Sequence, residues 1–168
     1  MHNRVILFFL SMILIGSAMA TTQKNIFGYA EKATLTQQDL TLPAKLDTGA
    51  KSASLNAANI KKIEKDNKTF LTFIVPSRTG DIPFECEYVG DVKIKIRSAE
   101  KKAGQIQKES IKRPTVMMKV QLNGQERDIR VNLTNRKNFI YPMLLGREAI
   151  MAFDGIVDPS KKFTIKNN

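Results

Sequence analysis

Residues 42–57 read LPAKLDTGAKSASLNA, and this stretch decides the fold that we predict for the chain. An apolar approach ends at Leu46, the tripeptide Asp47-Thr48-Gly49 follows, and Leu55 lies in the segment that leads away from it. Glycine allows a tight turn because it has no Cβ, and the threonine hydroxyl can bond to backbone groups and brace that turn. The stretch therefore predicts two strands joined by a turn that carries one carboxylate.

The residues alone allow two interpretations of Asp47. Asp and Gly are common turn residues, so an ordinary turn is the first. The second is a catalytic turn, because two such carboxylates side by side share a proton and can activate a water molecule for attack on a peptide carbonyl. The sequence has one Asp-Thr-Gly, so the second Asp47 must come from a second copy of the chain. A pair within one chain, with Asp154 or Asp158, is the alternative.

Histidine is absent after His2, which restricts the possible chemistry. A catalytic zinc site of the ordinary kind needs His, and so does a Ser-His or Cys-His nucleophile. Residues 21–168 therefore predict no metal site and no cofactor. A hydrolase built from them would use carboxylates, Lys, Tyr or Ser.

Residues 1–20 have the pattern of a cleavable signal peptide. Arg4 supplies the positive charge, residues 5–15 are apolar, and Ala18-Met19-Ala20 forms a small-x-small cleavage signal. An uncleaved membrane anchor is less favoured because the apolar run is shorter than the roughly 20 residues that span a bilayer. We expect cleavage after Ala20, a periplasmic or secreted protein with no membrane insertion after cleavage, and one domain over residues 21–168.

The chain is basic, with 27 Lys and Arg against 16 Asp and Glu and a formal net charge of +11. A solvated surface explains this excess, and so does attraction to anionic partners such as envelope surfaces or acidic peptides. Nucleic acid is not an expected partner, because an exported protein without interleaved aromatic and basic residues fits it poorly.

Most of the chain after residue 20 has strand patterns. Residues 69–75 are β-branched and aromatic and end at Pro76, while residues 92–97 alternate apolar and basic side chains. Cys86, the single cysteine, lies in an alternating segment at residues 84–88 and can form no disulfide within the chain. We expect it to be buried.

Two alternating segments, 116–122 and 129–133, flank Asn123-Gly124 and predict a hairpin, because both turn residues tolerate positive φ. Residues 147–153 favour one short helix. Residues 56–66 are polar and ambiguous, and residues 98–113 suit a mobile hairpin or a loop. The predicted fold is all-β: a small closed barrel with one short helix.

Blocks along most of residues 44–160 resemble one bacterial family. It is the retropepsin-like group long labelled "putative ATP-dependent zinc proteases". The blocks appear in order and are much more specific than the tripeptide alone. They are residues 42–57, RPTV at 113–116, VNLTNR at 131–136, YPMLLGRE at 141–148 and VDPS at 157–160.

The resemblance implies a barrel like that of retroviral proteases, with the active site at a homodimer interface. Asp47 corresponds to the catalytic aspartate, and Thr48, Gly49 and Ala50 complete its turn. Leu145, Gly146 and Arg147 correspond to the strand end that packs across this turn, and Arg147 is expected to be structural rather than catalytic.

The resemblance also implies a flap that closes over the substrate. Residues 98–110, with Gly104 near the tip, are the best candidate, and a plain solvated loop is the alternative. Lys101, Lys102 and Lys108 would then make the mouth of the cleft basic and favour acidic peptides.

Two parts of the family label find no support in the residues. The family often carries His where this chain has Asn56, so any metal role of that position is lost. Residues 49–52, GAKS, only faintly resemble a phosphate-binding loop and lack its Gly-Lys-Ser/Thr ending. We therefore expect neither zinc nor ATP.

Taken together, the sequence predicts a homodimeric aspartic-type peptidase of the cell envelope that acts on peptide or protein substrates. A catalytically inactive peptide-binding module of the same fold, which captures an extended peptide by strand addition, is the first alternative. A structural dimer that retains the turn for packing alone is the second.

Overall fold

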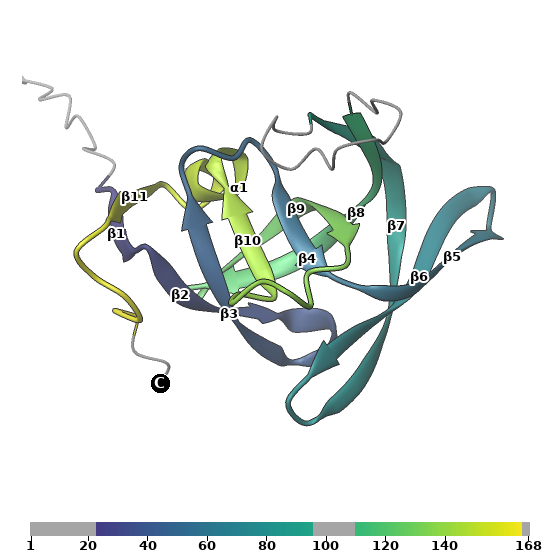
Figure 1. Cartoon of the computed structure of the whole chain (residues 1–168), viewed down its shortest axis with the longest axis horizontal. Coiled ribbons are helices and arrows are strands. Elements are labelled where there is room, and N and C mark those ends of the chain that lie inside the picture. The colour runs from purple at the N-terminus through teal and green to yellow at the C-terminus, as the bar shows by residue number, and fades with distance from the viewer. Residues whose placement is uncertain (1–22, 96–109, 166–168) are drawn as a thin grey trace, which may run out of the picture.

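The computed structural model describes residues 23–95 and 110–165. Strands dominate these ranges, with one short α-helix after the last barrel strand, as the sequence predicted (Figure 1). The elements are β1 (Asn25–Gly28), β2 (Ala30–Leu35), the 3-10 helix η1 (Thr36–Gln38), β3 (Leu40–Asp47), β4 (Ala53–Asn56), β5 (Ala58–Lys65), β6 (Lys68–Ser77), β7 (Gly80–Lys95), β8 (Ser110–Leu122), β9 (Gln125–Thr134), β10 (Met143–Gly146), α1 (Arg147–Ala152) and β11 (Gly155–Asp158).

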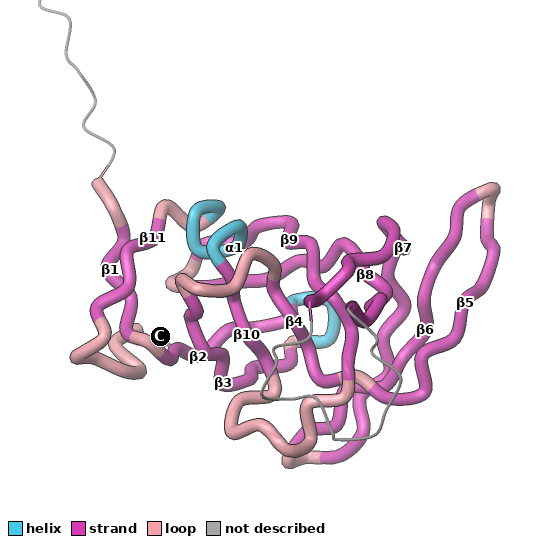
Figure 2. Tube along the Cα trace, turned by 45° about the horizontal axis from the view of Figure 1, so that its top comes forward, coloured by secondary structure: helices cyan, strands magenta, loops and turns pink. Residues whose placement is uncertain are grey.

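One large sheet contains most of the strands, in the order β2-β3-β10-β4-β9-β8-β7-β6-β5. A further pairing of β2 with β8 closes the first six of them into a ring, which is the predicted barrel. The β5–β6 hairpin extends away from this ring (Figures 1 and 2). β1 and β11 form a separate parallel pair on the opposite side of the molecule.

The barrel core follows from alternation along the strands. On β3, Leu42, Ala44 and Leu46 are buried, while their neighbours on the other face are more exposed. The same inward face carries Leu55 of β4 and Leu145 of β10, both with 0% exposure. The side chains between these core residues therefore point to the opposite face of the sheet.

The predicted hairpin at Asn123-Gly124 is confirmed. Leu122 pairs with Gln125, which leaves a two-residue turn, and φ is +52° at Asn123 and +71° at Gly124. Positive φ at both central residues is the geometry of a type I′ turn, whose twist matches that of the flanking strands.

The end of β6 and the presence of β5 differ from the sequence prediction. Pro76 does not end β6, which continues to Ser77 with Pro76 paired to Asp81. Near the tip of a hairpin, the missing proline N–H affects few ladder bonds. Most of the polar segment at residues 56–66, whose pattern was ambiguous, forms strand β5. It is a strand because it pairs with β6.

Two predicted segments lie outside the described residues. They are the signal peptide at residues 1–20 and the flap candidate at residues 98–110, of which only Ser110 is described. β7 and β8, the strands on either side of that candidate, pair antiparallel up to Lys95 and Ser110. In the described ranges, no helix has the length and apolar character needed to cross a membrane.

Cys86 is buried, as predicted, with 5% exposure. Its Sγ donates to Gln37 Oε1 at 3.3 Å. Burial raises the pKa of the thiol to about 11, and the neighbouring Glu85 carboxylate acts in the same direction. The thiol is therefore protonated and unreactive near neutral pH.

Glu31 is a fully buried carboxylate that ties the C-terminal segment to the start of the fold. Its Oε1 accepts from Gly28 N at 2.7 Å, from Thr164 N at 3.1 Å and from the Thr164 hydroxyl. Its Oε2 accepts from Ile165 N at 3.2 Å. These donors compensate for the loss of water around a buried charge.

Glu31→Gln should lower the free energy of unfolding by about 2–4 kcal/mol, because the new NH₂ group would face N–H donors. Denaturant unfolding monitored by circular dichroism measures this loss. Glu87→Gln is the control: Glu87 is exposed and has one surface ion pair with Lys68, so its effect should stay below about 1 kcal/mol. Equal effects of the two changes would contradict the assigned role of Glu31.

Candidate active site

Asp47 lies at the end of β3, next to the end of β10. The two strands are parallel, with Leu46 opposite Leu145 and Gly146 opposite Asp47. Leu46 and Leu145 are buried in the core. Because core packing fixes the residues before Asp47 and Gly146, it also fixes where the turn begins.

The carboxylate of Asp47 organises its own turn. Its Oδ1 accepts from Gly49 N at 2.9 Å and from Ala50 N at 3.2 Å, and Ala50 N also approaches Asp47 O at 3.2 Å. Thr48 is exposed, and its hydroxyl makes no hydrogen bond to another described residue of this single chain. Within the single chain the turn is therefore braced by the carboxylate itself.

Arg147 holds the same turn from outside. Its Nη1 donates to Thr48 O at 3.0 Å and to Gly49 O at 3.1 Å, and its backbone N donates to Ala50 O at 2.9 Å. The guanidinium thus binds the backbone of the turn.

Gly146 sits where no side chain fits. A Cβ at this position would lie 2.6 Å from Ser52 O and 2.8 Å from Lys51 O. These are backbone atoms, so relief would require the chain leaving the Asp47 turn to shift. The glycine therefore allows β10 and this chain segment to pack closely together.

A row of buried polar residues lies on the same face of the sheet as Asp47. Lys45 shares the Asp47 face of β3 and is opposite Leu144, and successive pairings lead from Leu144 to Ser54, Asn132 and Thr115. The last three have between 2% and 4% exposure. Ser54, Asn132 and Thr115 thus form a buried polar row on the face that carries the carboxylate, and we call these three residues the polar floor.

Only some of the polar atoms of this floor form hydrogen bonds with described residues. Asn132 Nδ2 donates to Ser52 Oγ at 3.2 Å and to Ala53 O. Asn132 Oδ1 and Thr115 Oγ1 are buried and have no hydrogen-bond partner among the described residues. Such atoms are rare in folded proteins and call for an explanation.

Arg136, from the loop between β9 and β10, packs against this floor with 6% exposure. Its Nε donates to Tyr141 O at 3.3 Å, its Nη1 contacts Ser54 Oγ at 3.5 Å, and the guanidinium lies 4.4 Å from the centre of the Phe139 ring. Burial lowers the pKa of Arg136, Arg113 lowers it further, and Asp47 acts in the opposite direction. Arg136 is therefore within electrostatic range of the candidate catalytic carboxylate.

Asn56 has a structural function in this arrangement. Its Oδ1 accepts from the backbone N of Arg136 at 2.6 Å. The described residues contain no group of three or more His, Cys, Asp or Glu side chains that could hold a metal ion.

The alternative intrachain partners of Asp47 are engaged elsewhere. Asp154 pairs with Lys24 at 3.5 Å. Asp158 accepts from Ser160 and pairs with Lys161 at 2.9 Å, and these hydrogen bonds lower its pKa to about 2. Neither carboxylate contacts Asp47 in the described part of the chain, so the structure gives no support to a pair within one chain.

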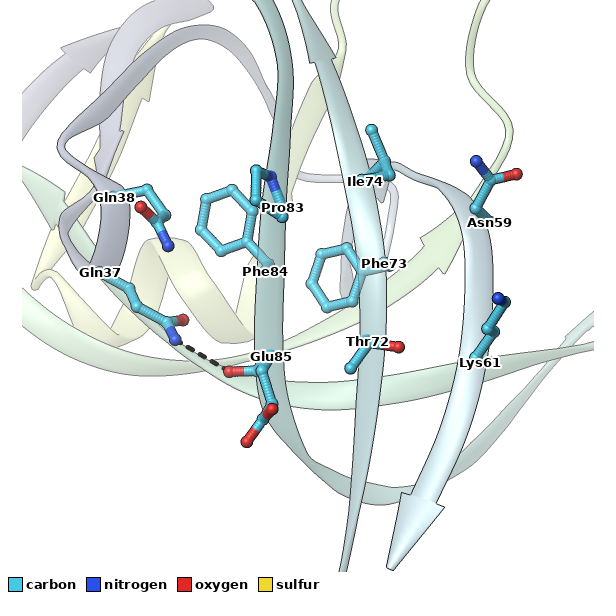
Figure 3. A pocket seen from close by; sticks show the side chains of 10 residues that line it. All are labelled: Gln37, Gln38, Asn59, Lys61, Thr72, Phe73, Ile74, Pro83, Phe84 and Glu85. Atoms are coloured by element: carbon cyan, nitrogen blue, oxygen red, sulfur yellow. Dashed lines mark hydrogen bonds between the residues drawn. The ribbon is translucent and has the colours of Figure 1, made fainter.

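A hollow in the surface lies between η1 and the β6–β7 region, apart from the Asp47 turn (Figure 3). Gln37 crosses one side of it and donates to Glu85 O at 2.9 Å. Phe73 and Phe84 lie beneath, but both are buried in the core. The turn contributes none of the residues that line this hollow, which is therefore not the candidate active site.

The polar floor and Arg136 were not among the site residues predicted from the sequence. Arg136 and Asn132 fall in the family-like block at 131–136, but no local pattern marked them. Their position beside Asp47 depends on strand register and on the path of one loop, which only the structure gives.

A protein-family model described as "RimB-like: Retropepsin-like aspartic endopeptidase RimB" matches residues 26–168. A crystal structure of protein Lpg0085, of unknown function, from Legionella pneumophila subsp. pneumophila is 53% identical, with a TM-score of 0.73, and the match covers 86% of this chain and all of that one. The family model confirms the retropepsin-like resemblance, but neither description carries the ATP-dependent zinc protease label.

Curated relatives have a different name. A protein of Shewanella pealeana named "Probable alpha-L-glutamate ligase" is 32% identical over 128 residues, or 74% of this chain and 26% of the relative. One of the same name from Desulfotalea psychrophila is 30% identical over 82% of this chain and 28% of the relative. The chain thus spans about a quarter of the length of these relatives.

Proposed function

Since the chain belongs to the RimB-like family of retropepsin-like aspartic endopeptidases, we propose that it is a peptidase whose catalytic pair consists of Asp47 from two copies. The observation that carries this proposal is the geometry of the turn. One carboxylate is held by two backbone N–H groups, on a turn that Gly146 and Arg147 fix from the other side. Such fixed placement is what a catalytic carboxylate requires.

The proposed pair works with a single shared proton. The ionised Asp47 takes a proton from a water molecule as the water oxygen attacks the peptide carbonyl carbon, while the protonated Asp47 of the other copy gives its proton to the carbonyl oxygen. Collapse of the resulting diol breaks the C–N bond, and a carboxyl proton passes to the leaving amine. Like charge at close range keeps the pair singly protonated.

A second copy can reach the turn. Thr48 and Gly49 are exposed at its tip, and Asp47 is partly exposed. An aspartate with no second carboxylate in contact within the described chain needs such a partner for this chemistry. The exposed turn therefore supports a two-fold arrangement with the turns facing each other.

Glutamate-containing peptides are the proposed substrates. Relatives named as probable glutamate ligases match most of this chain, and the formal charge of +11 favours acidic partners. We further propose that residues 1–20 direct the protein to the cell envelope and that residues 21–168 form the retropepsin-like domain.

A peptide library derived from a whole proteome tests the proposal. We expect residues 21–168 to cleave it between acid and neutral pH, with specific activity that rises with protein concentration as dimers form. Sedimentation gives the mass of the species at each concentration. A folded protein that cleaves nothing over this pH range would contradict the proposal and favour a peptide-binding module of the same fold.

A further inference from the structure

Arg136 is a buried cation that has no anionic partner in the part of the chain that the structure describes. It has 6% exposure, and no carboxylate of the described residues lies within the 4.0 Å of an ion pair. Its contacts are the Tyr141 carbonyl, the Ser54 hydroxyl and the Phe139 ring. Burying a charge is costly unless it is paired, so an incoming anion would relieve this cost.

The charged groups that act on Arg136 are a second arginine and the candidate catalytic carboxylate. Arg113 acts on Arg136 as a like charge, and Asp47 is the one carboxylate with a resolved electrostatic effect on it. A guanidinium suits a carboxylate in particular, because its N–H groups match the two oxygens.

The polar floor next to Arg136 has donor capacity to spare. In residues 23–95 and 110–165, the buried Thr115 Oγ1 has no hydrogen-bond partner. Ser54 Oγ accepts from Arg136 and so retains its own hydroxyl proton for donation. Both lie in the row that register places on the face of Asp47.

Phe139 lies over Arg136 on the surface of the molecule. Its ring covers the Arg136 guanidinium but is itself 60% exposed, on the loop between β9 and β10. A cation–π contact at an exposed ring is weak, so an incoming group could displace this ring at modest cost. A substrate group that enters here would therefore replace or pack beside that ring.

We propose that Arg136, together with the hydroxyls of Ser54 and Thr115, forms a carboxylate-binding subsite beside Asp47. This inference rests on the proposed function and adds the residue that determines specificity. The carboxylate belongs to a glutamate or aspartate side chain near the scissile bond, or to the C-terminus of the peptide. In both cases Arg136 positions the substrate and takes no part in the proton transfers.

The first test uses the unaltered protein and therefore cannot be affected by misfolding. The best-cleaved peptide is compared with versions in which each Glu or Asp is replaced by Gln or Asn, and with a version amidated at the C-terminus. We expect one replacement to lower kcat/KM by about 100-fold. The position that responds distinguishes a side-chain carboxylate from the terminal one, and the absence of any response would overturn the proposal.

The second test assigns the discrimination to Arg136. In Arg136→Gln and Thr115→Val, the ratio of kcat/KM between the acidic peptide and its amide version should fall toward one, most strongly in Arg136→Gln. A merely structural role would lower both rates and keep the ratio. Arg130→Gln is the matched control, because Arg130 is an exposed arginine of β9 bound to the Val89 carbonyl, and it should leave the ratio unchanged.

A binding measurement separates this inference from the proposed function. Fluorescence anisotropy with Asp47→Asn protein compares labelled acidic and amide peptides without turnover. If the unaltered protein never cleaves but acidic peptides bind about 100-fold tighter through Arg136, the subsite stands and the peptidase proposal fails. If the protein cleaves and neither cleavage nor binding distinguishes the peptides, the subsite fails and the peptidase proposal stands.

Discussion

Replacing Asp47 with asparagine is expected to lower kcat/KM by about 10,000-fold or more on every peptide that the protein cleaves. Asparagine can neither accept the proton of the attacking water nor carry the shared proton. Its Oδ1 can still accept from the Gly49 and Ala50 N–H groups. The turn, the fold and any dimer should therefore persist while the chemistry stops.

The rate is measured by mass spectrometry of peptide products, together with a thermal unfolding curve for each protein. Asp128→Asn is the control, because Asp128 is an exposed carboxylate of β9 whose partner is a surface lysine. It should leave kcat/KM and Tm nearly unchanged. If Asp47→Asn kept more than about a tenth of the activity with its fold intact, Asp47 would not be the catalytic carboxylate.

Gly146→Ala is expected to have the largest effect on stability, about 3 kcal/mol or more, with loss of activity. The added methyl group would lie 2.6 Å from Ser52 O and 2.8 Å from Lys51 O. Lys51 O also accepts from Glu148 N at 3.1 Å. A shift that relieved the overlap would therefore disturb the contact between α1 and the turn.

Denaturant unfolding and peptide cleavage together measure this effect. Gly49→Ala is the comparison, since its methyl group would meet the side-chain oxygen Asp47 Oδ1 at 3.2 Å rather than backbone. We expect it to cost less than about 1 kcal/mol of stability yet to lower activity, because it displaces the carboxylate. A Gly146→Ala protein as stable as the unaltered one would show that β10 and the turn are not packed as described.

The sequence predicted those parts of the fold that have a local signal. Alternation marked the strands around Asn123-Gly124, and the segment after Gly146 marked the helix. β5 was not predicted, because it is an edge strand whose residues are all exposed or partly exposed, so no face alternates. The segment forms a strand because it pairs with β6, and this pairing depends on the fold and not on the sequence of the segment alone.

The candidate site divides in the same way. Asp47 and its turn could be found from the sequence, because the tripeptide and the later Leu145-Gly146 each have a characteristic pattern. Arg136, Asn132 and Thr115 could not, since buried polar residues on two strands and a loop give no periodic signal. Within the single chain the bonds that hold the turn come from the Asp47 carboxylate and from Arg147, and the bracing role of Thr48 stays a prediction.

The central claim is that each active site takes one Asp47 from each of two chains. Its most direct test mixes the unaltered protein with an equal amount of Asp47→Asn protein, under conditions in which subunits exchange, and measures the cleavage rate. With random pairing, half of the unaltered chains are expected to pair with an Asp47→Asn chain and so to lose their activity. The mixture should therefore show about half of the activity that the same amount of unaltered protein shows on its own. Activity that stayed equal to that of the unmixed sample would mean that one chain suffices and would contradict the claim.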